Sequence, residues 1–137
     1  MKYILNVLEV LAGGVSLAFT SSWAVVIFIV LLVAGILVFR VRPARAWQFA
    51  LLPLGSTLAL AFWGAAFHRT RTEMPSVPAW QNLVTELLLF AFVPLAVVAV
   101  WKAKGSRPFA FLVTAIAGVP TYWCYFYAYM RVSGDWI

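Results

Sequence analysis

The chain has 137 residues, of which 65% are hydrophobic and only 10% are charged. Soluble domains are about 45–50% apolar and about 25% charged, so this composition excludes an ordinary water-soluble domain and indicates an integral membrane protein. The net charge of +6 comes from basic residues in short segments between apolar runs. That pattern is typical of membrane topology rather than of nucleic-acid binding. We therefore expect membrane lipid, and no nucleic acid, as a partner.

The single cysteine and the single histidine exclude several kinds of site. With only Cys124, the chain forms no intrachain disulfide and no thiolate cage for a metal. With only His68, it cannot hold a haem between two histidines of its own. The sequence therefore predicts no metal site, and no cofactor is evident from it.

Five apolar runs each reach the ~17–25 residues that a helix needs to cross ~30 Å of hydrocarbon. They cover about 3–20, 22–39, 47–67, 79–101 and 108–130. Because the loops between them are short, we expect successive helices to be antiparallel neighbours. The sequence thus predicts one all-α domain over residues 1–137, a polytopic membrane bundle of five transmembrane helices.

The first run carries a polar and small stripe that a membrane helix would turn toward its neighbours. The stripe consists of Asn6, Glu9, Gly13, Ser16 and Thr20. Steps of three and four residues put all of them on one helix face, and the other faces are apolar. A carboxylate inside a span costs a few kcal/mol, so Glu9 needs a partner or a proton. Asn6 and Glu9 also interrupt the apolar core of a removable signal peptide, so we expect a span here.

The next two runs differ in their small and polar content. The second run is apolar all round, so we place it at the periphery, against lipid or a neighbouring subunit, with Gly35 allowing one close contact. In the third run, Gly55 and Ala59 form a small-xxx-small pair suited to close packing. There we expect Ser56 or Thr57 to hydrogen-bond backbone that a proline kink sets free.

The last two runs each contain a proline and a polar stripe. Pro94 predicts a kink in the fourth run, and Pro120 lies within the fifth. The stripe of the fifth run consists of Thr114, Gly118, Thr121 and Tyr125, at steps of four, three and four. We expect the polar stripes of the first, fourth and fifth helices to face the interior of the bundle.

Loop charge predicts the orientation. With the N-terminus inside, the inner segments hold Lys2, Arg40, Arg42, Arg45, Lys102, Lys104 and Arg107, whereas the outer segments hold Arg69, Arg71 and Arg131. The positive-inside rule then favours N-in/C-out, in a bacterial inner membrane. On this topology Glu9 and Glu86 lie in opposite leaflets, so we expect no direct pairing between them.

Glu9 and Glu86 are the strongest candidates for function, because ionisable residues inside spans are usually functional. They fit a proton or transport path, structural hydrogen bonds to neighbouring helices, or a contact between subunits, and the sequence leaves these open. Asn6 and Asn82 each share a helix face with one of the carboxylates. These asparagines would join helices or orient the carboxylates, and Thr85 completes the polar candidate set.

The far end of the fifth run is unusually aromatic. Its candidate ligand-contacting residues are Tyr122, Trp123, Tyr125 and Tyr129. We favour an interfacial aromatic belt, which membrane proteins generally have. The alternative is a hydrophobic pocket for a quinone, a pigment or a lipid tail. Trp23, Trp63 and Trp80 are expected at the same outer level as this cluster.

No catalytic motif is present: the chain has no HExxH, GxSxG or Walker sequence and no cluster of Asp or His. No spacing supports an enzyme built from Glu9, Glu86, His68 and tyrosines. The sequence favours a non-catalytic accessory subunit of a larger membrane complex of respiratory or photosynthetic type. One alternative is a small transporter or channel, working as a homo-oligomer and proton-coupled through Glu9 and Glu86. Another is a binding protein or enzyme for a lipid, quinone or pigment.

Overall fold

A computed structural model of the chain describes residues 2–20, 51–67 and 78–133, together with residues 23, 26, 27, 29–31, 33 and 34. Within these ranges every element is a helix, as the composition predicted. The helices are α1 (Lys2–Thr20), α4 (Leu54–Ala66), α5 (Ala79–Phe90), α6 (Phe92–Lys102) and α7 (Arg107–Ser133). Three stretches are long and apolar enough to cross a membrane: α1, Ala79–Lys102 and α7. The described part of α4 is apolar but shorter.

Several predictions concern residues outside the described part of the chain. These are most of the second span with Gly35, the start of the third span, the basic segment 40–45 and the connector 68–77 with His68. The residues of 22–39 that are described are helical. Their large side chains, such as Trp23 and Val30, are mostly exposed, in agreement with a peripheral helix.

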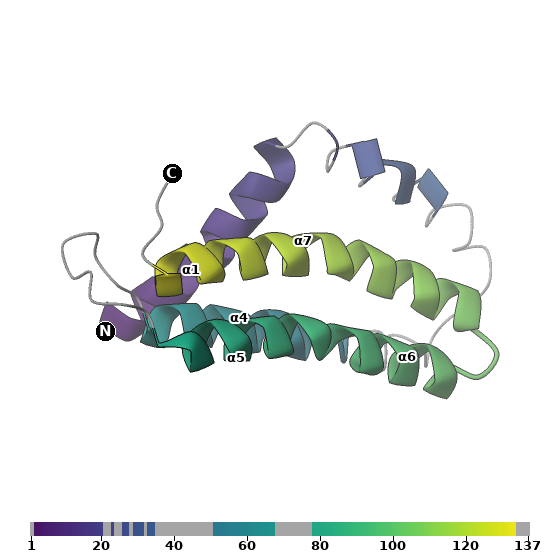
Figure 1. Cartoon of the computed structure of the whole chain (residues 1–137). Coiled ribbons are helices and arrows are strands. Elements are labelled where there is room, and N and C mark those ends of the chain that lie inside the picture. The colour runs from purple at the N-terminus through teal and green to yellow at the C-terminus, as the bar shows by residue number, and fades with distance from the viewer. Residues whose placement is uncertain are drawn as a thin grey trace.

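Helix α7 is the centre of the fold, since it contacts α1, α4, α5 and α6 (Figure 1). The α5–α6 stretch runs antiparallel beside α7, and α4 lies alongside both (Figure 1). The turn between α6 and α7 contains Gly105, whose φ of +87° is a left-handed conformation that favours glycine. This turn brings the C-terminal end of α6 next to the N-terminal end of α7.

The buried face of α7 explains how so many helices approach it. That face, the small-residue stripe of α7, consists of Ala110, Thr114, Ala117, Thr121, Cys124 and Ala128. Small residues let helix backbones come close, which matters in a membrane because apolar burial gives little driving force there. Thr114 and Thr121 are buried as predicted, whereas Gly118 and Tyr125 lie partly exposed at its margin. The hydroxyl oxygens of Thr57 on α4 and Thr121 are 2.6 Å apart and join the two helices by a hydrogen bond.

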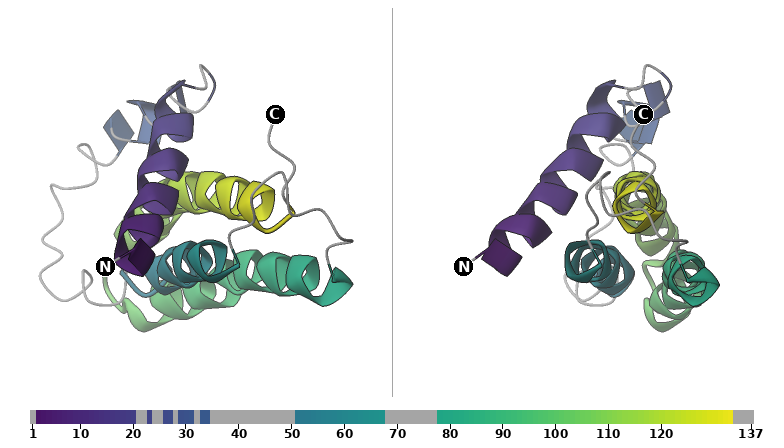
Figure 2. Two further views of the ribbon diagram at one scale, coloured as in Figure 1. Left: turned by 90° about the vertical axis from the view of Figure 1, so that its left-hand side faces the viewer. Right: turned by 60° about the vertical axis from the view of Figure 1, so that its left-hand side comes forward.

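Helix α1 crosses the other described helices at an angle, and most of its successor in the chain, 22–39, lies outside the described residues, so antiparallel packing of α1 with its successor stays a prediction. In the right-hand view of Figure 2, α4, α5 and α7 are seen nearly end-on while α1 is seen from its side, so α1 crosses them steeply. Its N-terminal turns lie beside the C-terminal ends of α4 and α7: the Tyr3 hydroxyl donates a hydrogen bond of 2.9 Å to the Phe62 carbonyl.

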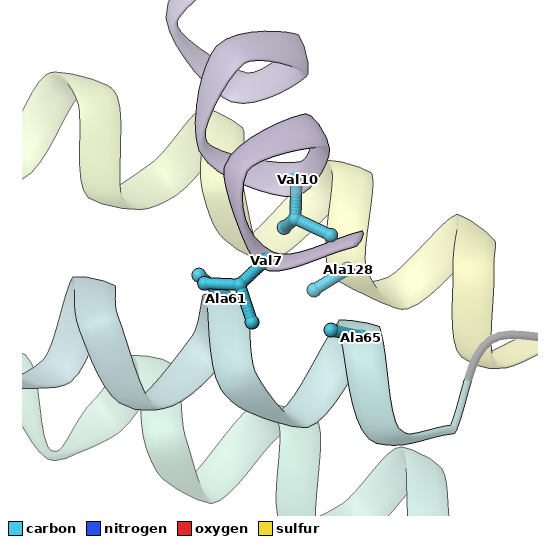
Figure 3. Close-up of a cluster of buried hydrophobic side chains, with 5 residues drawn as sticks. All are labelled: Val7, Val10, Ala61, Ala65 and Ala128. Carbon is cyan, nitrogen blue, oxygen red and sulfur yellow. The ribbon is translucent and has the colours of Figure 1, made fainter. Parts of the chain in front are cut away.

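The face that α1 buries is one residue away from the predicted polar stripe. Val7, Val10 and Gly14 are buried, whereas Glu9 and Ser16 are exposed. The prediction was wrong because the surface that receives α1 is built of small apolar side chains. The valines pack against Ala61, Ala65 and Ala128 (Figure 3). Compact apolar residues fill this contact, so the polar stripe turns to its edge.

Glycines set the closest approaches of the fold. A Cβ on Gly14 would lie 2.5 Å from Sγ and 2.9 Å from Cα of Cys124, and one on Gly64 would lie 2.9 Å from Cβ of Ala128. The predicted close contact at Gly55 and Ala59 is wrong, because a Cβ on Gly55 would meet nothing within 4 Å. The close approach lies two to three turns further along the same helix, where α4 passes α7.

The helix is interrupted between α5 and α6 at Ala91, three residues before Pro94, but Ala91 keeps helical dihedral angles (φ −60°, ψ −22°), so the kink expected near Pro94 stays a prediction. Proline has no backbone N–H and its ring clashes with the carbonyl four residues earlier, which is that of Phe90. The Ser56 hydroxyl of α4 donates a hydrogen bond to the Leu88 carbonyl, next to this break. The carbonyl that Pro94 sets free is that of Phe90 rather than Leu88, so the expectation that Ser56 or Thr57 hydrogen-bonds backbone freed by a proline kink stays a prediction.

These contacts predict opposite effects for two glycine-to-alanine substitutions. Gly14→Ala should destabilise the protein by about 1–3 kcal/mol, because backbone atoms of Cys124 block the added methyl group. Gly55→Ala should leave stability unchanged or raise it by up to about 1 kcal/mol, because alanine is the better helix former and the site is open. The midpoint of thermal unfolding in a mild detergent measures both. Equal shifts would contradict the packing of α1 on α7.

Candidate functional site

The small-residue stripe of α7 ends in a charge. Arg131 follows Ala128 at the next helical step, and its side chain is only 2% exposed, the largest fully buried side chain of the described residues. Its Nη2 lies 2.6 Å from Oε1 of Glu9, and its Cζ lies 5.4 Å from the centroid of the Tyr127 ring. A buried cation is costly unless an opposite charge pairs with it, so α1 supplies what α7 requires.

Glu9 thus has the partner that its position in a span demands. The pair is asymmetric, because the Glu9 side chain is 57% exposed while Arg131 is buried. The carboxylate therefore lies at the rim of the bundle, with one oxygen directed to the guanidinium. We expected Glu9 to face the interior of the bundle. It lies instead at the edge of the contact, because Val7 and Val10 occupy the centre.

The contact corrects the sequence-based placement of Glu9 and Arg131 at opposite ends of the bundle. Loop charge had put Arg131 at the outer surface and Glu9 toward the inner end of the first span, which would separate them. A distance of 2.6 Å shows that they lie at the same end of the bundle. The physical reason is the direction of α1 relative to α7: Glu9 lies against Arg131 and Gly14 lies against Cys124, so the two helices pass each other in opposite directions.

The sequence did not predict that Arg131 is buried, because the fifth apolar run was taken to end at residue 130 whereas α7 continues to Ser133. A signal was present: Thr121, Cys124, Ala128 and Arg131 continue one helical face at steps of three, four and three. The required partner for Glu9 pointed the same way. An arginine that continues a small-residue face is therefore better interpreted as buried than as a loop charge.

Glu86 lies on the outward face of α5, although we expected it to face the bundle interior. The inward position is taken by Thr85, which is fully buried and donates a hydrogen bond of 2.8 Å to the Gln81 carbonyl. The same hydroxyl accepts a hydrogen bond of 3.1 Å from Nε1 of Trp63 on α4. Because one residue corresponds to about 100° of helix rotation, burial of Thr85 turns Glu86 outward.

The surroundings of Glu86 are apolar and aromatic. Leu83, Leu87 and Phe90 share its face and are 55%, 57% and 64% exposed. Glu86 of α5 also lies close enough to Tyr125 of the neighbouring helix α7 for the two side chains to interact electrostatically. Glu9 and Glu86 therefore lie beside the C-terminal half of α7 rather than at opposite ends of the bundle, and no contact of the described residues joins them.

The two asparagines have different surroundings. Asn6 is partly buried on α1, one turn before Glu9. Asn82 is also partly buried, and its Oδ1 accepts no hydrogen bond from the part of the chain that the structure describes. Their predicted roles, in joining helices or in orienting the carboxylates, stay predictions.

The aromatic end of α7 forms a continuous series of ring contacts. Tyr122 contacts Trp123 and Tyr125, with ring centroids 5.9 and 6.4 Å away; Tyr125 contacts Tyr129 and Trp123 contacts Phe126, both at 5.9 Å. Tyr122 and Trp123 line an open hollow of about 370 Å³, and Tyr125 and Tyr129 do not. Two of the four predicted pocket residues therefore line one hollow.

The three tryptophans expected at one level belong to two groups. Trp23 lines the hollow beside Tyr122 and Trp123. Trp63 and Trp80 pack together at 5.9 Å, and both contact Phe67 at the C-terminal end of α4.

A larger hollow lies at the other end of α7, where the sequence indicated only a basic loop. This groove has a volume of about 470 Å³ and runs between α6 and α7. Its walls include Phe92, Ala96, Val100 and Trp101 of α6 and Arg107 and Phe111 of α7. It is apolar along its length and carries one cation, Arg107, at its end.

The described residues contain no group of three or more His, Cys, Asp or Glu side chains that could hold a metal ion. No family model, curated protein or solved structure matches the chain.

A double-mutant cycle tests the Glu9–Arg131 pair. Glu9→Gln should cost about 1–2 kcal/mol of stability, between the values for exposed and buried pairs, because it deprives a buried cation of its carboxylate. Adding Arg131→Met should recover part of this loss, since the double variant buries no charge there. Thermal unfolding in detergent gives the energies.

The matched control is Glu86→Gln, which removes a carboxylate that has no ion pair with a described residue. It should change the unfolding midpoint little. Equal effects of Glu9→Gln and Glu86→Gln would contradict a stabilising role of the ion pair.

Proposed function

We propose that this chain is a non-catalytic accessory subunit of a larger membrane complex, of respiratory or photosynthetic type. The observation that carries the proposal is the outward carboxylate of Glu86 on an otherwise apolar face of a helix long enough to span a membrane. Such a face is unsuited to lipid alone but suited to another protein.

The energetic argument is direct. A charged residue facing the middle of a bilayer costs about 2.5–3.5 kcal/mol on insertion scales. The ion pair of the described residues joins Glu9 to Arg131, and Glu86 has no such partner among them. A basic or hydrogen-bonding side chain of a neighbouring subunit would remove the penalty, as buried charges generally require.

The surroundings of Glu86 support docking of a partner helix. Leu83, Leu87 and Phe90 give it an apolar margin, and Tyr122 and Tyr125 extend this surface onto α7. Aromatic residues are enriched at the centres of protein interfaces. The surface therefore combines apolar contact area with one polar group that would fix the register of the partner.

A second copy of this chain would also fit beside Glu86, and the transporter alternative depends on such a copy. Glu9 is already paired with Arg131, so Glu86 is the carboxylate that a proton path would use first. The ligand-binding alternative is supported by the hollow beside Tyr122 and Trp123. This hollow would bind a quinone, a pigment or a lipid tail by apolar contacts alone, because no Lys or Arg is among the described residues that line it.

We also propose an orientation of the chain in the membrane. The turn with Lys102, Lys104 and Arg107 lies at the opposite end of α7 from Arg131, and the positive-inside rule favours this turn on the cytoplasmic side of a bacterial inner membrane. For the last three apolar runs this agrees with the five-span N-in/C-out arrangement. For the first run, the contact of Glu9 with Arg131 argues against an N-terminus on the cytoplasmic side.

Site-specific photo-crosslinking in native membranes tests the proposal. A photoreactive residue at Leu83 should give one crosslinked partner of a different protein. Glu86→Leu should reduce that product by more than about tenfold, since removing one member of an interfacial charge pair costs several kcal/mol. The control position is Leu58 on α4, a leucine of similar exposure (48% against 55% for Leu83), which should give no such product.

Two outcomes would overturn the accessory-subunit proposal. One is a crosslinked product that Glu86→Leu leaves unchanged. The other is a crosslink from Leu83 to a second copy of the same chain, which would favour the homo-oligomeric transporter. Proton flux in liposomes, compared between the wild type and Glu86→Gln, would then test that alternative.

A further inference from the structure

The groove between α6 and α7 has a polar end and an apolar end. On α6 it follows Phe92, Ala96 and Val100 at four-residue steps, and on the antiparallel α7 it extends from Arg107 to Ala115. Eight residues of helix rise about 12 Å, which gives the approximate length of the groove. Arg107 lies at the α6–α7 turn, and Phe92 and Ala115 lie toward the middle of the bundle.

The polar end is strongly basic. Arg107 is exposed and pairs with no carboxylate of the described ranges. It is also the first residue of α7, where the helix dipole adds a partial positive charge. Lys104 in the adjoining turn is exposed as well. These groups attract an anion, and a guanidinium can hold a phosphate by two parallel hydrogen bonds.

The apolar walls alone would not select an occupant, because lipid tails are as apolar as the side chains. Selection must therefore come from the charged end. The volume of about 470 Å³ lies within the ~300–1,000 Å³ of small-molecule sites.

From this combination we infer that the α6–α7 groove binds one acidic phospholipid of the surrounding membrane. The phosphate lies against Arg107 at the membrane surface, and an acyl chain lies along Val93 and Val97 toward the bundle middle. Trp101 flanks the headgroup, where tryptophan side chains of membrane proteins commonly lie. The site is at the opposite end of α7 from Arg131, so it does not depend on docking at Glu86.

Native mass spectrometry of the purified chain tests this inference. The protein, in an uncharged detergent, is mixed with equal amounts of phosphatidylglycerol and phosphatidylcholine of identical chains. One phosphatidylglycerol should be retained in preference. Arg107→Gln should weaken that retention roughly five- to tenfold, whereas phosphatidylcholine retention should not change. Lys2→Gln, which removes an exposed cation outside the groove, should have no effect.

Variants that fill the groove distinguish a lipid bound inside it from a lipid that is only attracted to the basic turn. Ala96→Phe and Ala115→Phe place a ring on opposite walls, and either variant that keeps the wild-type unfolding midpoint should lose the bound phosphatidylglycerol. Retention of the lipid in a folded groove-filled variant would overturn the inference. Equal retention of both lipids by the wild type, or equal losses in Arg107→Gln and Lys2→Gln, would also overturn it.

Discussion

The ion pair between Arg131 and Glu9 is the constraint on which the arrangement of α1 depends. Arg131 is almost fully enclosed by the protein, so its charge has to be neutralised within reach of its guanidinium. Glu9 meets this need from a helix that otherwise crosses α7 steeply (Figure 2). The contact between the two helices extends from Glu9 and Arg131 to Gly14 and Cys124, so the charged pair anchors one end of it.

Small residues make that crossing compact. Gly14 lies against Cys124, and Gly64 lies against Ala128, so three helices meet within one or two turns of Arg131. In a membrane such close packing replaces the hydrophobic effect as the source of helix association. The larger apolar side chains are left on the outside, where α5 also exposes Glu86.

Sequence patterns predicted the class of the protein and several local features, but not the helix faces. Composition and run length predicted an all-helical protein with membrane-spanning helices. Spacing of polar residues was misleading for α1 and α5, because Val10 and Thr85 fill compact sites that Glu9 and Glu86 could not enter. Arg131 was assigned to a loop, since an apolar run ends at the first charge even where the helix continues.

A distance between the N-terminal part of α1 and the C-terminal end of α7 tests this account most directly. Spin labels at Leu5 and Ser133, in a Cys124→Ser background and in lipid bilayers, give that distance by pulsed electron resonance. Because Leu5 is about 6 Å along α1 from Glu9, the account predicts a separation below about 20 Å. A separation near the ~30 Å hydrocarbon thickness would place the two ends on opposite membrane faces and contradict it.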